Sequence, residues 1–248
     1  MHITEIEARE LAPNGILRAA INTGNAVLAR REPAPVGASG VSVDLAQHLA
    51  QQAGLALELV IYATARDSVQ GVKNGAADFG FFAIDPKRGQ DIAFTAPYVL
   101  IEGSYLVAEA SPIQDIAEVD QPTHTVVVGQ GSAYDLFLTR ELKQATIARA
   151  ATSPAVVDTF LQSGADVAAG VRQQLEADAQ RLGGLRLLPG HFMLIRQAMG
   201  VSHNRGPRVA ALLSRFLEDA KASGFVAEAI ARHRIPGVAV ASAANTLA

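Results

Sequence analysis

The sequence predicts an α/β fold of two lobes, in which a second α/β unit is inserted into the first and two strands cross between them. Three observations lead to this prediction. Short apolar runs typical of buried strands alternate with segments whose apolar residues recur at helical spacing. The alternation occurs twice, before residue 98 and again from residue 125, and such alternation favours parallel sheets with right-handed connections. The chain then returns through an apolar run over Phe192–Val201 and ends in helical segments.

The first α/β series is predicted to run β-α-β-α-β. A strand over Ile16–Ile21 leads into a loop over Asn22–Ser39 that is rich in Gly, Pro and Asn. Ser42 or Asp44 is predicted to cap a helix with an apolar face, which ends at Gly54. The remaining elements are a strand over Ala56–Tyr62, a helix over Asp67–Lys73 and a buried strand over Phe79–Ile84.

The second series begins after a strand over Gly103–Ala108 and a polar connection over Ser111–Thr123. Strands are predicted over Thr125–Val128, Thr146–Ala150, Asp166–Gly170 and Leu185–Leu188, with helices starting at Ser132, at Ser153-Pro154 and at Val171, and two final helices separated at Gly224. We place the crossing strands near Ile101–Tyr105 and Met193–Gln197. Lobe 1 then comprises residues 1–101 and 198–248, and lobe 2 comprises residues 102–197.

Composition limits the function. A chain of 248 residues with 49% hydrophobic residues can bury a sizeable core. Its net charge of -3, without a basic cluster, argues against nucleic acid as a partner, whereas a small molecule suits it. No apolar run is long enough to span a membrane. The first fifteen residues contain acids and no apolar core, so they do not form a secretory signal peptide.

Patterns for catalysis or metal binding are not found. The chain has no cysteine, and its six histidines do not show metal-ligand spacing. It also lacks a Gly-x-Ser-x-Gly elbow and a phosphate-binding Walker loop. We therefore expect no metal, no cofactor and no catalytic residue.

Arg88 is the first candidate for a functional residue. The apolar strand that begins at Phe79 breaks at Asp85-Pro86, because proline cannot continue a central strand. Ligands bind at the carboxyl ends of strands in open α/β sheets, and an arginine there can hold a carboxylate with two parallel hydrogen bonds. The alternative is a surface ion pair between Arg88 and Asp85 or Asp91.

The segment around Arg88 resembles the signature of the type 2 periplasmic solute-binding proteins, the amino-acid-binding receptors of ABC importers (family 3). The matching features are a Gly-x-x-Asp turn ending at Asp78, an apolar strand, Pro86-x-Arg88, and Phe94-Thr95-x-Pro97-Tyr98. The resemblance extends over about Leu17–Ile235. It implies the type 2 two-lobed fold, a ligand enclosed by hinge closure, a periplasmic location, an ABC permease or membrane sensor as partner, and a monomer.

A Gly129-x-Gly131-Ser132 turn before a predicted helix adds a second candidate group. Gly-x-Gly alone is a weak signal, and the segment also suits a tight turn with a helix N-cap. The resemblance implies that backbone N–H groups around Ser132 and Ala133 hold the ligand carboxylate together with Arg88.

Several positions depart from the amino-acid-binding pattern. Where those receptors hold the ligand's ammonium or cover it with an aromatic ring, this chain has Asn22, Asn25, Phe81 with Ala83, and Val171. Burying an ammonium without partners costs several kcal/mol. We therefore expect a small organic carboxylate, an acid or an atypical amino acid, rather than a common α-amino acid.

The predicted pocket includes a second cation and an apolar wall. Arg172 is either that cation or an exposed residue of a helix's first turn, and Phe82 is either the wall or a core residue. The predicted ligand-binding residues are Arg88, Ser132, Ala133, Asn25, Asn22, Phe82, Ala83 and Arg172.

Two other functions remain open. Some relatives of these receptors are cyclohexadienyl dehydratases, which need a general acid, and Glu102 and Asp85 are the acids this chain offers. A cytoplasmic ligand-sensing domain is the other alternative, since the chain as given carries no signal peptide.

Overall fold

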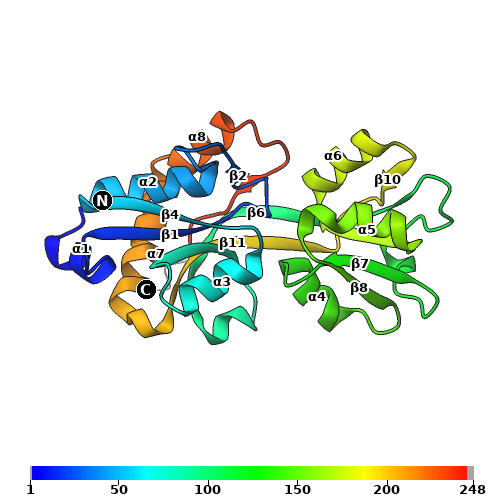
Figure 1. The fold of residues 1–248 in the computed structure, drawn as a ribbon, viewed down its shortest axis with the longest axis horizontal. Helices are drawn as coiled ribbons and strands as arrows, with labels where there is room; N and C mark the ends of the chain where they lie inside the picture. The colour runs from blue at the N-terminus through cyan, green and yellow to red at the C-terminus, as the bar shows by residue number, and fades with distance from the viewer. Residues whose placement is uncertain (1, 245–248) are drawn as a thin grey trace. The chain divides into compact units, whose positions relative to one another are not determined.

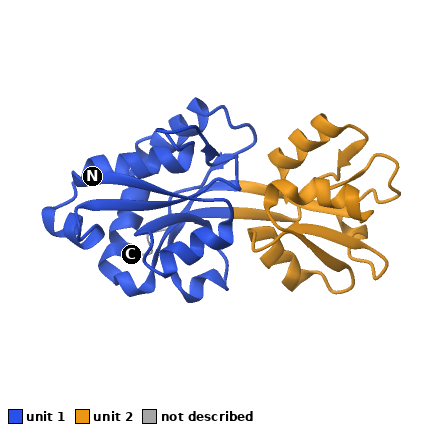
Figure 2. Cartoon of the chain, viewed as in Figure 1, with its two compact units in different colours: residues 1–100, 196–248 blue, residues 101–195 orange. Residues whose placement is uncertain are grey.

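The computed structural model describes residues 2–244, and the chain divides into two compact units (Figure 2). Unit 1 comprises Met1–Leu100 and Arg196–Ala248, and unit 2 comprises Ile101–Ile195. The sequence placed the lobe boundaries after residues 101 and 197. That these units close on a ligand stays a prediction.

The sheet of unit 1 follows the predicted α/β pattern. Its strands are ordered β4 (Ala56–Tyr62), β1 (Ile16–Asn22), β5 (Phe79–Ala83), β11 (Met193–Ser202) and β6 (Ile92–Ala108). Strand β1 pairs in parallel with both β4 and β5, whereas β11 is antiparallel to β5. The α/β fold class predicted from the sequence is therefore confirmed, and the observed sheet is mixed because β11 is antiparallel to β5. Strands β6 and β11 contain the chain's two passages between the units.

Helices lie on both sides of these strands, with α2 and α3 on opposite sides of β1 and β4 (Figure 1). The helices of unit 1 are α1 (Glu5–Leu11), α2 (Val41–Ala53), α3 (Ala65–Lys73), α7 (Pro207–Ala222) and α8 (Phe225–Arg232). The short elements are strands β2 (Arg30–Arg31), β3 (Ala38–Ser39) and β12 (Ala239–Val240), with 3-10 turns η1 (Arg88–Gln90) and η4 (His203–Arg205).

The predicted cap of helix α2 was wrong. Gly40 is the N-cap, with φ of 131°, and no side chain caps this helix. Ser42 and Asp44 instead lie inside the helix and make tertiary contacts. The Ser42 hydroxyl lies 3.4 Å from the Tyr98 hydroxyl, and Asp44 accepts a hydrogen bond from Arg232 of α8 at 2.6 Å.

Phe82 occupies the core of unit 1, with 2% of its surface exposed. It packs in a cluster with Ala20, Val72, Ala77 and Ile92. Its ring lies against two glycine backbones, because a Cβ atom placed on Gly80 or Gly200 would come within 2.4 Å or 3.1 Å of the ring. Gly80 of β5 and Gly200 of β11 are cross-strand neighbours, and together they make room for the Phe82 ring on this face of the sheet.

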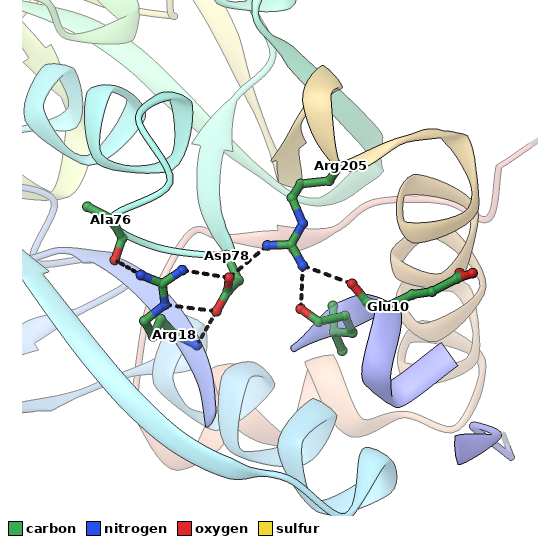
Figure 3. Close-up of polar contacts among 6 residues, drawn as sticks. Glu10, Arg18, Ala76, Asp78 and Arg205 are labelled. Atoms are coloured by element: carbon green, nitrogen blue, oxygen red, sulfur yellow. Dashed lines mark hydrogen bonds and ion pairs between the residues drawn. The ribbon is translucent and has the colours of Figure 1, made fainter. Parts of the chain in front are cut away.

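A buried carboxylate joins several segments at the amino end of β5. Asp78, 3% exposed, accepts hydrogen bonds from Arg18 at 2.9 Å and from Arg205 at 2.7 Å (Figure 3). Despite burial, these hydrogen bonds and charges lower the pKa of Asp78. Arg205 also donates to the backbone carbonyls of Glu10 and Leu11, at 2.9 and 2.7 Å, and so attaches the end of α1 to the sheet.

The sequence prediction assigned no element to the residues that form α1. This helix begins with a capping box, in which the Thr4 hydroxyl accepts from the Glu7 N–H and the Glu7 carboxylate accepts from the Thr4 N–H. Glu7 also pairs with Arg215 of α7 at 2.5 Å, and Glu10 pairs with Arg208 at 3.1 Å. Short helices need such tertiary contacts, because seven residues are too few for stability in isolation.

Unit 2 is a second α/β unit. Its strands are ordered β6, β9 (Val167–Val171), β7 (Thr125–Gly129) and β8 (Thr146–Ala150), with β10 (Leu185–Leu187) paired to β6. Strands β7, β8 and β9 are mutually parallel, and β6 is antiparallel to β9. The helical elements are α4 (Ala133–Glu141), α5 (Val156–Ser163), α6 (Arg172–Leu182), η2 (Ile116–Glu118) and η3 (Ser153–Ala155). Leu106, Val127, Phe160, Ala168 and Leu175 belong to its core.

Within residues 2–244, no helix has both the length and the apolar character needed to cross a membrane.

We predict that Glu7→Gln lowers the melting temperature at pH 7 and that this effect disappears in acid. The Thr4 N–H and Arg215 lower the pKa of Glu7 from 4.5 to about 2. A carboxyl whose folded-state pKa is depressed stabilises the protein fully above the unfolded pKa, and this stabilisation is lost as the pH falls toward the folded pKa. Thermal melts from pH 7 down to about pH 2 should therefore show the difference between the two proteins shrinking progressively below about pH 4.5.

Glu5→Gln is the matched control, because Glu5 lies in the same helical turn and no hydrogen bond or ion pair is assigned to its side chain. A Glu7→Gln effect that is independent of pH, or equal to that of Glu5→Gln, would contradict this account of α1.

Candidate functional site

The guanidinium of Arg88 lies at the carboxyl end of β5. The strand ends at Ala83, the chain turns at Asp85-Pro86, and η1 begins at Arg88. Arg88 is 6% exposed, and its Nη1 donates to the Ala83 carbonyl at 3.2 Å. Arg88 is therefore not a surface residue. Arginine side chains are rarely buried without a specific reason.

The charge of Arg88 is maintained despite its burial. Loss of hydration lowers its pKa to about 10, while the nearby Asp85 carboxylate acts in the opposite direction. The guanidinium is therefore protonated at neutral pH. Asp85 is itself 5% exposed and accepts from the backbone N–H of Lys87 at 2.8 Å and of Arg88 at 3.4 Å.

The loop after β1 supplies two amide side chains with different surroundings. The Oδ1 of Asn22 accepts from the Gly24 N–H at 3.0 Å and stabilises the turn that leaves the strand. The Oδ1 of Asn25 is buried and has no hydrogen-bond partner among residues 2–244. An unsatisfied buried acceptor costs about 1–3 kcal/mol, so it is a candidate for pairing with a donor from outside the chain.

The aromatic residues of β5 pack inside unit 1. Phe82 belongs to the core described above, so we leave it out of the proposed ligand contacts. Phe81, on the other face of the strand, is 6% exposed and makes edge contacts with Phe79 and Tyr98 at centroid distances of 5.7 and 6.1 Å. Ala83 is 3% exposed and contributes its carbonyl to Arg88.

The start of helix α4 in unit 2 is ordered by its own side chains. The Ser132 Oγ accepts from the Asp135 N–H at 3.0 Å, which makes Ser132 the N-cap. The Ser132 N–H donates to the Gly129 carbonyl at 3.0 Å, and the Gly131 N–H donates to the Asp135 carboxylate at 2.8 Å. The next N–H group is that of Ala133, which as the first helical residue has no intrahelical acceptor.

Gly129 allows close packing beneath this turn. A Cβ atom there would lie 2.8 Å from both the Tyr134 hydroxyl and the Ser153 backbone. Tyr134 is 3% exposed, and burial raises the pKa of its hydroxyl. Glycine is therefore required at position 129, because Tyr134 and the Ser153 backbone approach it closely. This packing holds the turn before α4 in one geometry.

Arg172, the predicted second cation, is engaged within unit 2. It forms an ion pair with Glu102 of β6, donates to the Gly190 carbonyl at 2.5 Å, and lies 3.7 Å from the Glu176 carboxylate. With two acidic neighbours, its charge is already balanced. We therefore do not retain Arg172 as a ligand group.

The comparison with protein families covers the segment around Arg88. Residues 31–234 match the bacterial extracellular solute-binding proteins, family 3, and this match covers most of the chain. The chain belongs to this family. The resemblance inferred from the segment around Arg88 is thus confirmed. No curated protein matches the chain.

Solved structures share the fold of this solute-binding protein at low sequence identity. A binding component of an ABC transporter from Wolinella succinogenes DSM 1740, complexed with lysine, has a TM-score of 0.76 and 22% identity, covering 88% of this chain and 95% of that chain. The solute receptor for L-cysteine of Neisseria gonorrhoeae has a TM-score of 0.77 and 20% identity, with 94% of each chain covered. The ancestral amino-acid-binding protein AncCDT-1, a precursor of cyclohexadienyl dehydratase, has a TM-score of 0.75 and 18% identity, covering 91% and 97%.

Within each unit of this solute-binding protein, the predicted site residues gather at one edge of the sheet. Asn22 ends β1 and Ala83 ends β5, and these strands are parallel neighbours, so Asn22, Asn25 and Arg88 follow strand ends at one edge of unit 1. In unit 2, Ser132 and Arg172 follow the parallel strands β7 and β9. Sequence reasoning missed the partner of Arg172, because Glu102 lies 70 residues away along the chain. It also missed the carboxylate of Asp135, although an acid in the first turn of a helix is a recognisable signal.

Among residues 2–244, no group of three or more His, Cys, Asp or Glu side chains is arranged to hold a metal ion.

We predict opposite effects on ligand-free stability for two neighbouring asparagines. Asn25→Ala should leave the melting temperature unchanged or raise it, because the substitution removes a buried acceptor that has no partner. Asn22→Ala should lower it, because the Gly24 N–H loses its acceptor. Thermal melts of both variants without added ligand test this. A clear loss of stability in Asn25→Ala would show that its side chain supports the loop and is not held ready for a ligand.

Proposed function

We propose that this family 3 protein is the solute-binding receptor of an ABC-type importer and captures a small organic carboxylate. The observation that carries the proposal is the buried, charged guanidinium of Arg88 at the end of β5. In unit 1, Arg88 is the charge partner that we propose for a carboxylate. In unit 2, the candidate backbone donor is the Ala133 N–H at the start of α4, because the Ser132 N–H already donates to the Gly129 carbonyl. We place the receptor in the periplasm, as a monomer, with an ABC permease or a membrane sensor as its partner.

The ligand class follows from the groups around Arg88. Asn22, Asn25 and Ala83 carry no charge, and the nearby Asp85 carboxylate already acts on Arg88 and accepts from the Lys87 N–H, so these groups supply no separate partner for a buried ammonium. The unpartnered Oδ1 of Asn25 supports a ligand that carries a neutral donor, such as a hydroxyl group. We therefore propose an organic acid with an uncharged, hydrogen-bonding body. A hydroxy acid fits this description better than the amino acid of the same skeleton.

The number of carboxylates on the ligand follows from the cations that can receive them. Arg172 is engaged by Glu102 and Glu176 within unit 2, and we assign Arg88, at the end of β5, to the ligand. A second ligand carboxylate would need a partner of its own, because burying an unpaired charge costs several kcal/mol. Monocarboxylates should therefore bind more tightly than dicarboxylates.

We propose binding without chemistry as the activity. The acids considered for a dehydratase both accept hydrogen bonds within the chain. Asp85 accepts from backbone N–H groups and Glu102 accepts from Arg172. A dehydratase would instead need a carboxyl group that can give a proton to its substrate. Incubation with prephenate should leave the substrate unchanged, and turnover that is lost in Glu102→Gln would favour the enzyme.

The test is a thermal-shift screen of refolded protein against sets of ligands that share a skeleton: the 2-amino acid, the 2-hydroxy acid and the unsubstituted acid, with dicarboxylates added. A ligand at a hundred times its dissociation constant adds about 2.7 kcal/mol of stability, which raises the melting temperature by several degrees. We expect hydroxy acids to give the largest shift. Arg88→Ala should abolish it by weakening binding by more than about 2 kcal/mol.

Arg172→Gln is the matched control, since Arg172 is a second partly buried arginine whose charge the chain itself balances. It should retain the shift seen with the unmodified chain. A larger shift with amino acids would overturn the proposed ligand class and leave the receptor function in place. Equal losses in Arg88→Ala and Arg172→Gln would overturn the assignment of Arg88.

A further inference from the structure

We infer that His203 is a positioning residue for Arg88, and thereby for the ligand site; this inference rests on the proposed function. His203 is exposed and lies in η4, directly after β11, more than a hundred residues from Arg88 along the chain. No sequence pattern singles it out. Its role follows from the way in which the loop over residues 85–91 is attached to the rest of unit 1.

The first half of this loop is held from within. The Gly89 N–H donates to the Asp85 carbonyl at 2.9 Å, and the Asp85 carboxylate accepts from the Lys87 N–H. These local bonds shape the turn. Arg88 adds a hydrogen bond from its guanidinium to the Ala83 carbonyl at the end of β5.

The second half is held from outside, largely by His203. The His203 N–H donates to the Asp91 carbonyl at 3.0 Å, and its imidazole Nε2 lies 3.0 Å from the Gly89 carbonyl oxygen. A carbonyl can only accept, so Nε2 carries the proton in this contact. Lys73 of α3 adds an ion pair to the Asp91 side chain at 2.9 Å. Gly89 directly follows Arg88, so the imidazole holds the backbone immediately after Arg88.

The turn that carries His203 is itself firmly attached. The Ser202 Oγ accepts from the Asn204 N–H at 3.3 Å. Two residues after His203, Arg205 bonds the buried Asp78 and two carbonyls at the end of α1 (Figure 3). His203 therefore connects the Arg88 loop to a part of unit 1 that is bonded to the sheet and to α1.

Loss of the imidazole contact should let the segment at Gly89 depart from its position for part of the time. Arg88 would then be correctly placed in only a fraction of the molecules, and ligand affinity would fall in proportion to that fraction. The same movement would bring the buried guanidinium to the solvent. This second consequence can be measured without any ligand.

The experiment follows the modification of Arg88 by phenylglyoxal, a reagent for accessible guanidinium groups, with peptide mass spectrometry. We expect His203→Ala to raise the Arg88 modification rate about twofold to tenfold, the equivalent of one neutral hydrogen bond. His203→Gln should restore a rate near that of the unmodified chain, because the glutamine amide nitrogen reaches as far as Nε2 and also donates. Asn204→Ala is the matched control, an exposed neighbour whose side chain has no assigned contact.

Arg18, which is bonded to Asp78 elsewhere in unit 1, serves as the internal reference and should react equally in all variants. An unchanged Arg88 rate in His203→Ala would overturn the inference, as would a parallel rise at Arg18, which would indicate general loosening. Failure of His203→Gln to restore the rate would also overturn it. Because no ligand is used, these outcomes are independent of whether the proposed carboxylate binds.

Discussion

Unit 1 keeps a guanidinium charged in a place from which water is largely excluded. Arg88 is 6% exposed, and burial lowers its pKa only to about 10, so the charge persists at neutral pH. Such burial opposes folding unless carbonyl and carboxylate groups surround the cation. Here the Ala83 carbonyl and the Asp85 carboxylate are supplied by the same strand end. A receptor gains from this arrangement, because the charge is fixed in place before the ligand arrives.

Residues far from Arg88 along the chain hold the loop that carries it. The loop that carries Arg88 must be specified closely, and it is attached to α3 through Lys73 and to the end of β11 through His203. Beyond His203, Arg205 links the same turn to Asp78 and to helix α1. The polar contacts at the amino edge of the sheet are thus connected to the loop that carries the proposed ligand group.

Sequence reasoning predicted most of the fold, because strands such as β5 are apolar runs with clear breaks and because the motif around Arg88 is specific. It missed α1, which is held by ion pairs with α7 and by hydrogen bonds from Arg205, all about 200 residues away along the chain. It could not decide the position of Phe82, since period-2 alternation does not reveal that Gly80 and Gly200 open space for the ring. It likewise could not find the pairing of Arg172 with Glu102, because ion pairs between distant segments leave no local pattern.

The most direct test of the central claim is native mass spectrometry of the receptor and of Arg88→Ala, both purified from the natural host without unfolding. The account predicts a bound small molecule that carries a carboxylate and is present on the unmodified receptor but absent from Arg88→Ala. A bound molecule without a carboxylate, or equal occupancy in the two proteins, would contradict the claim that the buried charge of Arg88 is there to hold the ligand.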